Sequence, residues 1–295
     1  MDRPGSDMTM PLQLPPEREG RAPPEELVQR RQGMAEAIAA GSWAVDPPPQ
    51  TVSLGGVRAL RFAAPGAPRA TVLHLHGGGF RQGRPEMIGP FAAALAQRCA
   101  VEVVCPAYRL APEHPFPAGL ADARAALTAL QASAVRPLIL SGDSAGGGLA
   151  AGLAALSAAD QPRPAALVLV SPWLDLTVAS RFYEINAGSD QVFSRLSATE
   201  AAGLYLQGAS PEHPLASPLF AAGAGFPPSF VCVGEGEVLV EDSRRFAQAL
   251  EAAGVPARLC VVPGMEHTAV VRGEALTGAA EAFAALAAFV DGVLA

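Results

Sequence analysis

An apolar run that ends in a glycine-flanked serine constrains the fold of this chain more than any other feature. Residues 138–141 read as a buried strand, Gly142-Asp-Ser-Ala-Gly146 follows at once, and an alanine- and leucine-rich segment of helical character comes next. A G-x-S-x-G pattern between a strand and a helix is typical of a tight elbow that exposes the serine at the top of a sheet. Glycine is needed on both sides of Ser144, because the turn is strained and the strand and helix approach closely.

Apolar strands and amphipathic helices alternate over most of the remaining sequence. After an antiparallel hairpin at 51–62, strands are predicted at 70–75, 101–105, 137–141, 165–170, 229–233 and 257–262, and helices at 90–99, 118–131, 144–158, 242–253 and 274–294. This alternation predicts an α/β fold, with a mostly parallel central sheet, an antiparallel start and helices on both faces. Ligands are then expected at the carboxyl ends of the strands.

Two stretches depart from this rhythm and are expected to form a helical cap. Residues 1–45 are predicted to be an N-terminal cap segment, disordered or loosely draped over 1–23 and helical from about Pro23 to Ala40. Residues 178–210 carry aromatic side chains but no strand pattern, and we expect a helical cap insertion that packs with the N-terminal helix. Residues 46–177 and 211–295 then form the catalytic domain.

Composition excludes several classes of protein. The 295-residue chain has a net charge of −7 and no lysine, and its arginines are scattered, so nucleic acid binding is not expected. No run approaches the ~18–20 apolar residues that span a bilayer, and the first 25 residues do not resemble a signal peptide, so a cytoplasmic protein without stable membrane insertion is expected. The cysteines are too dispersed for a disulfide framework or a C-x-x-C metal pair: Cys99, Cys105, Cys232 and Cys260.

A nucleophilic serine needs a base, and the five histidines of the chain can be weighed one by one. His267 follows the last predicted strand, at the same sheet edge as Ser144, and is the best candidate. His74 lies within a buried strand and is expected to be a core residue, whereas His114 and His213 lie beside prolines in loops. His76 opens the glycine run at 77–79, which is expected to have a role of its own.

The acid that orients the base should follow the strand at 229–233. Four residues compete there: Glu235, Glu237, Glu241 and Asp242. Distance from the strand end favours Glu237, while Glu241 and Asp242 suit the first turn of the next helix. Asp143 neighbours the serine, but adjacent residues in a tight elbow point apart, so a structural hydrogen bond is expected for it.

A glycine run at the end of another strand supplies a candidate oxyanion hole. Glycines at 77–79 allow the backbone to approach a substrate and to aim its N–H groups at a developing negative charge. Gly78, Gly79 and the N–H of Ala145 are the expected donors. No metal ion or organic cofactor is needed for such a site.

Together these motifs resemble the hormone-sensitive-lipase family of α/β-hydrolases, in its bacterial carboxylesterase branch. The resemblance spans roughly residues 50–295 and rests on His76-Gly-Gly-Gly-Phe80, Tyr108-Arg-Leu-Ala-Pro-Glu-His-Pro-Phe-Pro-Ala118, Gly142-Asp-Ser-Ala-Gly-Gly147, Ser171-Pro-Trp-Leu-Asp-Leu-Thr177, Glu237-x-Leu-x-x-Asp242 and Gly264-Met-Glu-His267. It implies the α/β-hydrolase fold, a triad of Ser144, the acid at position 237 and His267, and a cap. Many family members have aspartate where this chain has Glu237.

The sequence therefore predicts a carboxylic ester hydrolase that acts on small-molecule esters with short or medium acyl chains. Two alternatives remain: hydrolysis of amides, lactones or one acetylated metabolite, and a non-catalytic small-ligand receptor, which the presence of His267 disfavours. Arg109 and Glu113 are expected to form an internal ion pair, and Asp175 to be structural. The last strand, at 257–262, is a possible dimer edge.

Overall fold

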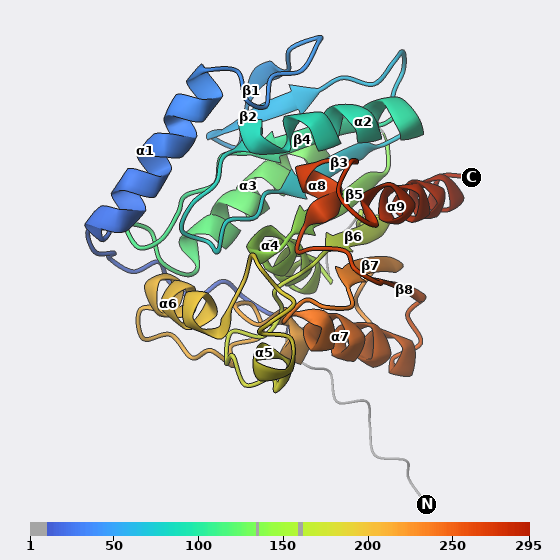
Figure 1. Ribbon diagram of the computed structural model, residues 1–295. Coiled ribbons are helices and arrows are strands. Elements are labelled where there is room, and N and C mark those ends of the chain that lie inside the picture. The colour runs from blue at the N-terminus through green and yellow to red at the C-terminus, as the bar shows by residue number, and fades with distance from the viewer. Residues whose placement is uncertain (1–10, 134–135, 159–161) are drawn as a thin grey trace, which may run out of the picture.

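One eight-stranded sheet organises the computed structural model, which describes residues 11–133, 136–158 and 162–295 (Figure 1). The strand order is β1-β2-β4-β3-β5-β6-β7-β8, and all pairs from β4 onward are parallel, whereas β1, β2 and β4 pair antiparallel. The strands are β1 Gln50–Leu54, β2 Val57–Phe62, β3 Thr71–Leu75, β4 Glu102–Pro106, β5 Leu138–Asp143, β6 Ala166–Val170, β7 Ser229–Gly234 and β8 Ala257–Val262. The predicted α/β architecture with an antiparallel start is confirmed.

Helices cover both faces of the sheet (Figure 1). They are α1 Glu25–Ala39, α2 Gly89–Cys99, α3 Ala118–Ser133, α4 Ala145–Leu156, α5 Phe182–Ile185, α6 Arg195–Leu206, α7 Val240–Ala252, α8 Ala269–Arg272 and α9 Ala279–Val293, with 3-10 turns η1 Pro85–Ile88 and η2 Pro218–Ala221. Side chains of α3, α4 and α7 share one core with the cap, and those of α2, α8 and α9 form the core on the other face.

The central strands are apolar on both faces because both faces are covered. Along β5, Ile139 points into the core beneath α2 and α9, while Leu138 and Leu140 point into the core beneath α3 and α4. This period of two is what a pleated strand imposes on its side chains. The central strands are thereby held rigidly, with their carboxyl ends at one edge.

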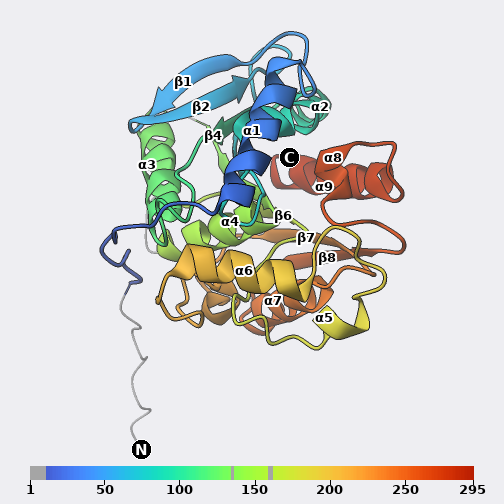
Figure 2. The same cartoon turned by 60° about the vertical axis from the view of Figure 1, so that its left-hand side comes forward.

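The N-terminal cap segment is docked along the part that the structure describes. Residues 11–23 have no regular secondary structure, yet the Arg18 guanidinium donates to the carbonyl oxygens of Leu206 and Gln207 at the end of α6. Leu12 packs against the core. Of the two alternatives expected for the start of the chain, disorder is wrong for 11–23, which lie against the rest of the protein without regular secondary structure. Residues 1–10 lie outside the described part of the chain. Figure 2 shows α1 and α6 on the same side of the molecule.

Two local predictions need correction. The last long helix begins at Ala279 rather than near residue 274, because Gly278 adopts a left-handed φ of 73° that ends the preceding turn. Arg109 does not pair with Glu113: its guanidinium contacts Asp122 and Glu17.

Glu113 instead pairs with Arg31 of α1, at 2.5 Å. The charged pairs in this region thus join the loop to separate parts of the chain, which sequence proximity could not indicate.

Two findings bear on association. Among the described residues, no helix combines the length and the apolar character needed to cross a membrane. Strand β8 lies at one edge of the sheet, with β7 as its neighbour. Pairing of β8 with a second copy stays a prediction.

The elbow generates a stability prediction. A Cβ on Gly146 would lie 2.0 Å from the carbonyl oxygen of Leu75, whereas a Cβ on Gly203, within α6, has no neighbour within 4 Å. Gly146→Ala should therefore lower the free energy of unfolding by several kcal/mol, on the order of an overpacked core substitution or more. Gly203→Ala should raise it by about 0.5–1 kcal/mol, because alanine is the better helix former.

Urea denaturation of both variants measures the difference. Equal stabilities of the two variants would contradict the close approach of α4 to β3.

Candidate active site

Ser144 stands at a strained elbow between β5 and α4. Its φ is 52°, in the region that non-glycine residues rarely adopt, and such a conformation persists only when its surroundings fix it. Its N–H donates to the carbonyl of Val170 at 3.0 Å, and its carbonyl accepts from the N–H of Trp173 at 3.0 Å. The neighbouring strand therefore holds the serine backbone in place, with Ala145 directly after it at the start of α4.

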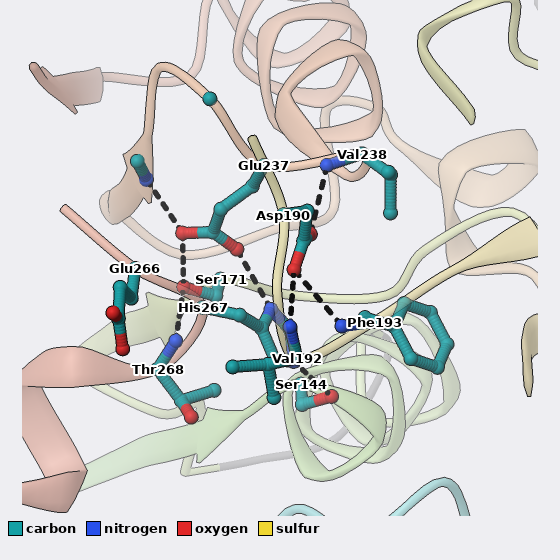
Figure 3. A network of polar contacts seen from close by, with 12 residues as sticks. Ser144, Ser171, Asp190, Val192, Phe193, Glu237, Val238, Glu266, His267 and Thr268 are labelled. Atoms are coloured by element: carbon teal, nitrogen blue, oxygen red, sulfur yellow. Dashed lines mark hydrogen bonds and ion pairs between the residues drawn. The ribbon is translucent and has the colours of Figure 1, made fainter. Parts of the chain in front are cut away.

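The structure brings the predicted serine, histidine and acid into contact (Figure 3). His267 Nε2 lies 2.9 Å from Ser144 Oγ, and His267 Nδ1 lies 2.7 Å from Glu237 Oε2. A carboxylate can only accept, so Nδ1 carries a proton and Nε2 is free to accept from the serine hydroxyl. The side chains come from three separate loops, at the carboxyl ends of β5, β7 and β8.

The second oxygen of the Glu237 carboxylate is also fully engaged. Oε1 accepts from the Ser171 hydroxyl at 2.8 Å and from the Gly234 N–H at 2.6 Å. Ser171 Oγ in turn accepts from the N–H of Thr268 at 3.0 Å, next to His267. Ser171 thus links the acid loop to the histidine loop. In the sequence, Ser171 opens one of the motifs of the family resemblance and directly follows β6 at the same sheet edge, but neither feature indicated this contact.

Asp190, in the cap insertion, braces the site from the other side (Figure 3). Its Oδ1 accepts from the N–H groups of Val192 and Phe193, and its Oδ2 accepts from the N–H of Val238 at 3.0 Å. The Phe193 ring stacks on the imidazole of His267, with ring centroids 5.6 Å apart. Sequence reasoning missed Asp190, because nothing in its local pattern distinguishes it from any acidic residue in a turn.

The other acids considered for this position lie elsewhere. Glu235 is exposed, and Asp242 is buried with its carboxylate accepting from the N–H groups of Leu174 and Asp175, at 3.0 Å each. Burial raises the pKa of Asp242 to about 7. The Glu241 and Asp242 positions do begin α7, as expected, but the Asp242 side chain holds the loop after β6 instead of capping its own helix.

The glycine loop lies over the serine in a conformation that needs glycine. Gly78 and Gly79 have φ values of 121° and 62°, and a Cβ on Gly78 would lie 2.0 Å from the carbonyl oxygen of Gln82. Asp143 has the structural role expected of it: its Oδ1 accepts from the N–H of Gly77 at 2.9 Å and contacts Nε2 of the core histidine His74.

A cavity of about 180 Å³ contains the reacting groups. Ser144, His267, Gly78 and Gly79 all line it, and so does Arg81. A second cavity, of about 420 Å³, shares part of this lining. Its other walls come from α1, the loop after α1, η1 and α8, and include Met34, Trp43, Met87, Ile88 and Val271. The site therefore has a small lobe at the serine and, beside it, a larger lobe lined by both apolar and polar residues.

The electrostatics of the two histidines near the site differ. Burial lowers the pKa of His267, but the hydrogen bond and charge of Glu237, aided by the charge of Asp190, outweigh it, so the pKa is raised above its ordinary value. Burial dominates at His76, whose pKa is lowered. His76 stacks on Tyr108, with centroids 4.3 Å apart, and its carbonyl accepts from the Tyr108 hydroxyl. Only His267 is thus placed and tuned to exchange a proton.

This sheet, with a serine elbow and a histidine–carboxylate pair at its carboxyl edge, defines an α/β hydrolase. Residues 72–271 match a family of the α/β hydrolase fold. An acetyl-hydrolase of Streptomyces hygroscopicus is 37% identical over 75% of this chain and 75% of its own, and an esterase of Acinetobacter venetianus is 35% identical over 72% of each.

Solved structures of related enzymes have the same fold. An esterase from the bacterial hormone-sensitive lipase family superposes with a TM-score of 0.85 at 34% identity, covering 93% of this chain and 94% of that one. A hormone-sensitive lipase from a metagenome library gives a TM-score of 0.86 at 33% identity, covering 94% of each. The chain belongs to the hormone-sensitive-lipase family of α/β hydrolases and is an ester hydrolase of the carboxylesterase class.

The contacts of His267 lead to a measurable titration. Its pKa, followed by ¹⁵N NMR of the imidazole, should lie above the ordinary value of ~6.5. Glu237→Gln should lower it, because the charge that favours the imidazolium is gone while the shape is kept. Asp190→Asn should lower it by less, since Asp190 affects the imidazole through its charge and makes no hydrogen bond to it among the described contacts.

Glu235→Gln is the matched control, because Glu235 is exposed, and should leave the titration unchanged. A pKa below ~6.5 in the unmodified protein would show that burial outweighs the carboxylates.

Proposed function

We propose that this enzyme hydrolyses carboxylic esters through Ser144, His267 and Glu237, with an acyl-enzyme intermediate. The observation that carries the proposal is the unbroken chain of contacts from Ser144 Oγ to His267 to Glu237, at 2.9 and 2.7 Å. His267 takes the serine proton as Oγ attacks the ester carbonyl, and then protonates the leaving alcohol. Water, activated by the same imidazole, releases the acid.

The N–H groups of Gly78, Gly79 and Ala145 are proposed to hold the oxyanion. Gly78 and Gly79 line the cavity of Ser144, and Ala145 follows it at the start of α4. Such donors lower the barrier where negative charge develops, each by roughly 3–4 kcal/mol. Glu237 keeps the imidazole in the tautomer that accepts at Nε2 and stabilises its charged form.

The proposed substrates are esters with short or medium acyl chains. The lobe at Ser144, of about 180 Å³, is small, and the larger lobe of about 420 Å³ offers room for the other part of the ester. An acetyl-hydrolase among the relatives fits a small acyl group. An amide substrate would use the same groups, and comparing p-nitrophenyl acetate with p-nitroacetanilide separates the two activities.

The nucleophile has a direct test. Ser144→Ala should lower kcat for p-nitrophenyl butanoate by at least about 10⁴-fold and leave the thermal unfolding temperature unchanged. In the unmodified enzyme, acid quenching during turnover followed by mass spectrometry should find a butanoyl group on the peptide that contains Ser144. A pre-steady-state burst of p-nitrophenol in Ser144→Ala would assign the nucleophile elsewhere, and an enzyme inert on all esters would support a receptor.

The acid is tested by a matched pair of substitutions. Glu237→Gln keeps the size of the side chain but removes its charge, and should lower kcat by about 10⁴-fold, as expected when the orienting carboxylate of a triad is lost. Glu235→Gln, two residues away and exposed, should leave kcat within about twofold of the unmodified enzyme. A larger loss of kcat in Glu235→Gln than in Glu237→Gln would assign the role of the acid to Glu235.

A further inference from the structure

A buried arginine lies in the wall of the cavity that holds the serine. Arg81 follows the glycine loop, is only 4% exposed, and lines the cavity of about 180 Å³ together with Ser144 and His267. Its Nε would lie 3.6 Å from a Cβ placed on Gly79, so the guanidinium stands directly beside a proposed oxyanion donor. A charged side chain is rarely buried without a partner for each of its polar groups.

The side-chain donors of Arg81 are only partly satisfied by the protein. Nη2 donates to Ser197 Oγ over a long 3.3 Å. Nη1 lies 2.8 Å from Glu200 Oε1 in an ion pair, and among the described residues this buried atom has no hydrogen-bond acceptor. Within the described part of the chain, no acceptor is found for Nε either, and Nε is not among the fully buried atoms. Since Nε stands beside Gly79, a ligand oxygen in the cavity would supply the acceptor that Nε lacks.

The ion pair with Glu200 leaves Arg81 able to donate a hydrogen bond to a ligand in the cavity. The Glu200 side chain is 45% exposed, so water competes for it, whereas the guanidinium faces the cavity. Ser197, on the same turn of α6, also lines the cavity and adds a hydroxyl to its polar wall. A cavity made only for an alkyl chain would gain nothing from these two groups.

The acyl part of the substrate is the part that this wall would meet. During turnover the acyl group is bonded to Ser144 Oγ, so it remains beside the cavity that Ser144 lines together with Arg81. Building on the proposed function, we propose that the preferred acyl group carries a hydrogen-bond-accepting oxygen, which Arg81 recognises with the help of Ser197. An oxygenated short acyl chain is thus the substrate class.

Isosteric ester pairs test this. p-Nitrophenyl methoxyacetate differs from the butanoate, and p-nitrophenyl 3-methoxypropanoate from the pentanoate, by one ether oxygen in place of a methylene. For each pair the ratio of kcat/KM values, oxygenated over alkyl, is divided by the ratio of the hydroxide-catalysed rates, which removes intrinsic reactivity. In the unmodified enzyme this corrected ratio should exceed unity by roughly tenfold to a hundredfold for at least one pair, the range of a hydrogen bond to a charged donor.

Substitutions assign the effect to Arg81. Arg81→Met keeps the length of the side chain without its donors and should bring the corrected ratio close to unity, while Arg81→Lys should keep part of it. Arg84→Met is the matched control: Arg84 is exposed and lines only the neighbouring lobes, so the ratio should not change.

Two results would overturn the inference. One is a corrected ratio near unity for both pairs in the unmodified enzyme, a measurement that needs no variant to fold. The other is an Arg81→Met enzyme whose rates on both members of each pair fall equally, which would make Arg81 a brace between the glycine loop and α6. An unmodified enzyme inactive on all four esters would instead refute the proposed function.

Discussion

The site depends first on how closely the first turn of α4 packs against the strands. Gly142 and Gly146 have no room for a side chain, since a Cβ on either would lie 2.3 Å or less from a backbone carbonyl oxygen. Within this tight turn Ser144 adopts a positive φ, and the backbone hydrogen bonds to Val170 and Trp173 hold it there. The strained backbone of Ser144 costs of order 1–3 kcal/mol, which the stability of the surrounding sheet offsets. From this backbone position the serine hydroxyl contacts the imidazole of His267.

The surrounding loops also stabilise the buried pair of Glu237 and His267. Glu237 is 1% exposed, and an isolated carboxylate there would be very unfavourable. Contacts from Ser171, Gly234 and His267 satisfy both of its oxygens. Because the donors come from loops after β6, β7 and β8, the sheet edge itself supplies the environment that permits a buried charge. The fold and the chemistry are thus joined through the Ser171 hydroxyl and the Gly234 N–H, whose contacts with the acid no sequence motif specifies.

Much of this architecture was predictable from the sequence, for a specific reason. Ser144, Glu237 and His267 each follow an apolar strand, and parallel strands bring their carboxyl ends to one edge. Contacts between a loop and a distant cap segment carry no such periodic pattern. Asp190 could not be found in this way, and neither could the partners of Arg109, because charged residues in turns pair with whichever segment the tertiary fold brings near. The start of α9 was misplaced since Gly278 ends a turn that the composition alone suggests is helical.

The attachment of the cap insertion has a consequence for how molecules reach the serine. Asn186 donates to the carbonyls of Glu235 and Glu237, Ser189 donates to the carbonyl of Gly236, and Asp190 holds Val238. Swinging this segment outward would pull on the very loop that presents the carboxylate to the imidazole. Displacing this segment would therefore break these hydrogen bonds and disturb the position of Glu237, so the opening of the site and the geometry of its acid are coupled through residues 186–190.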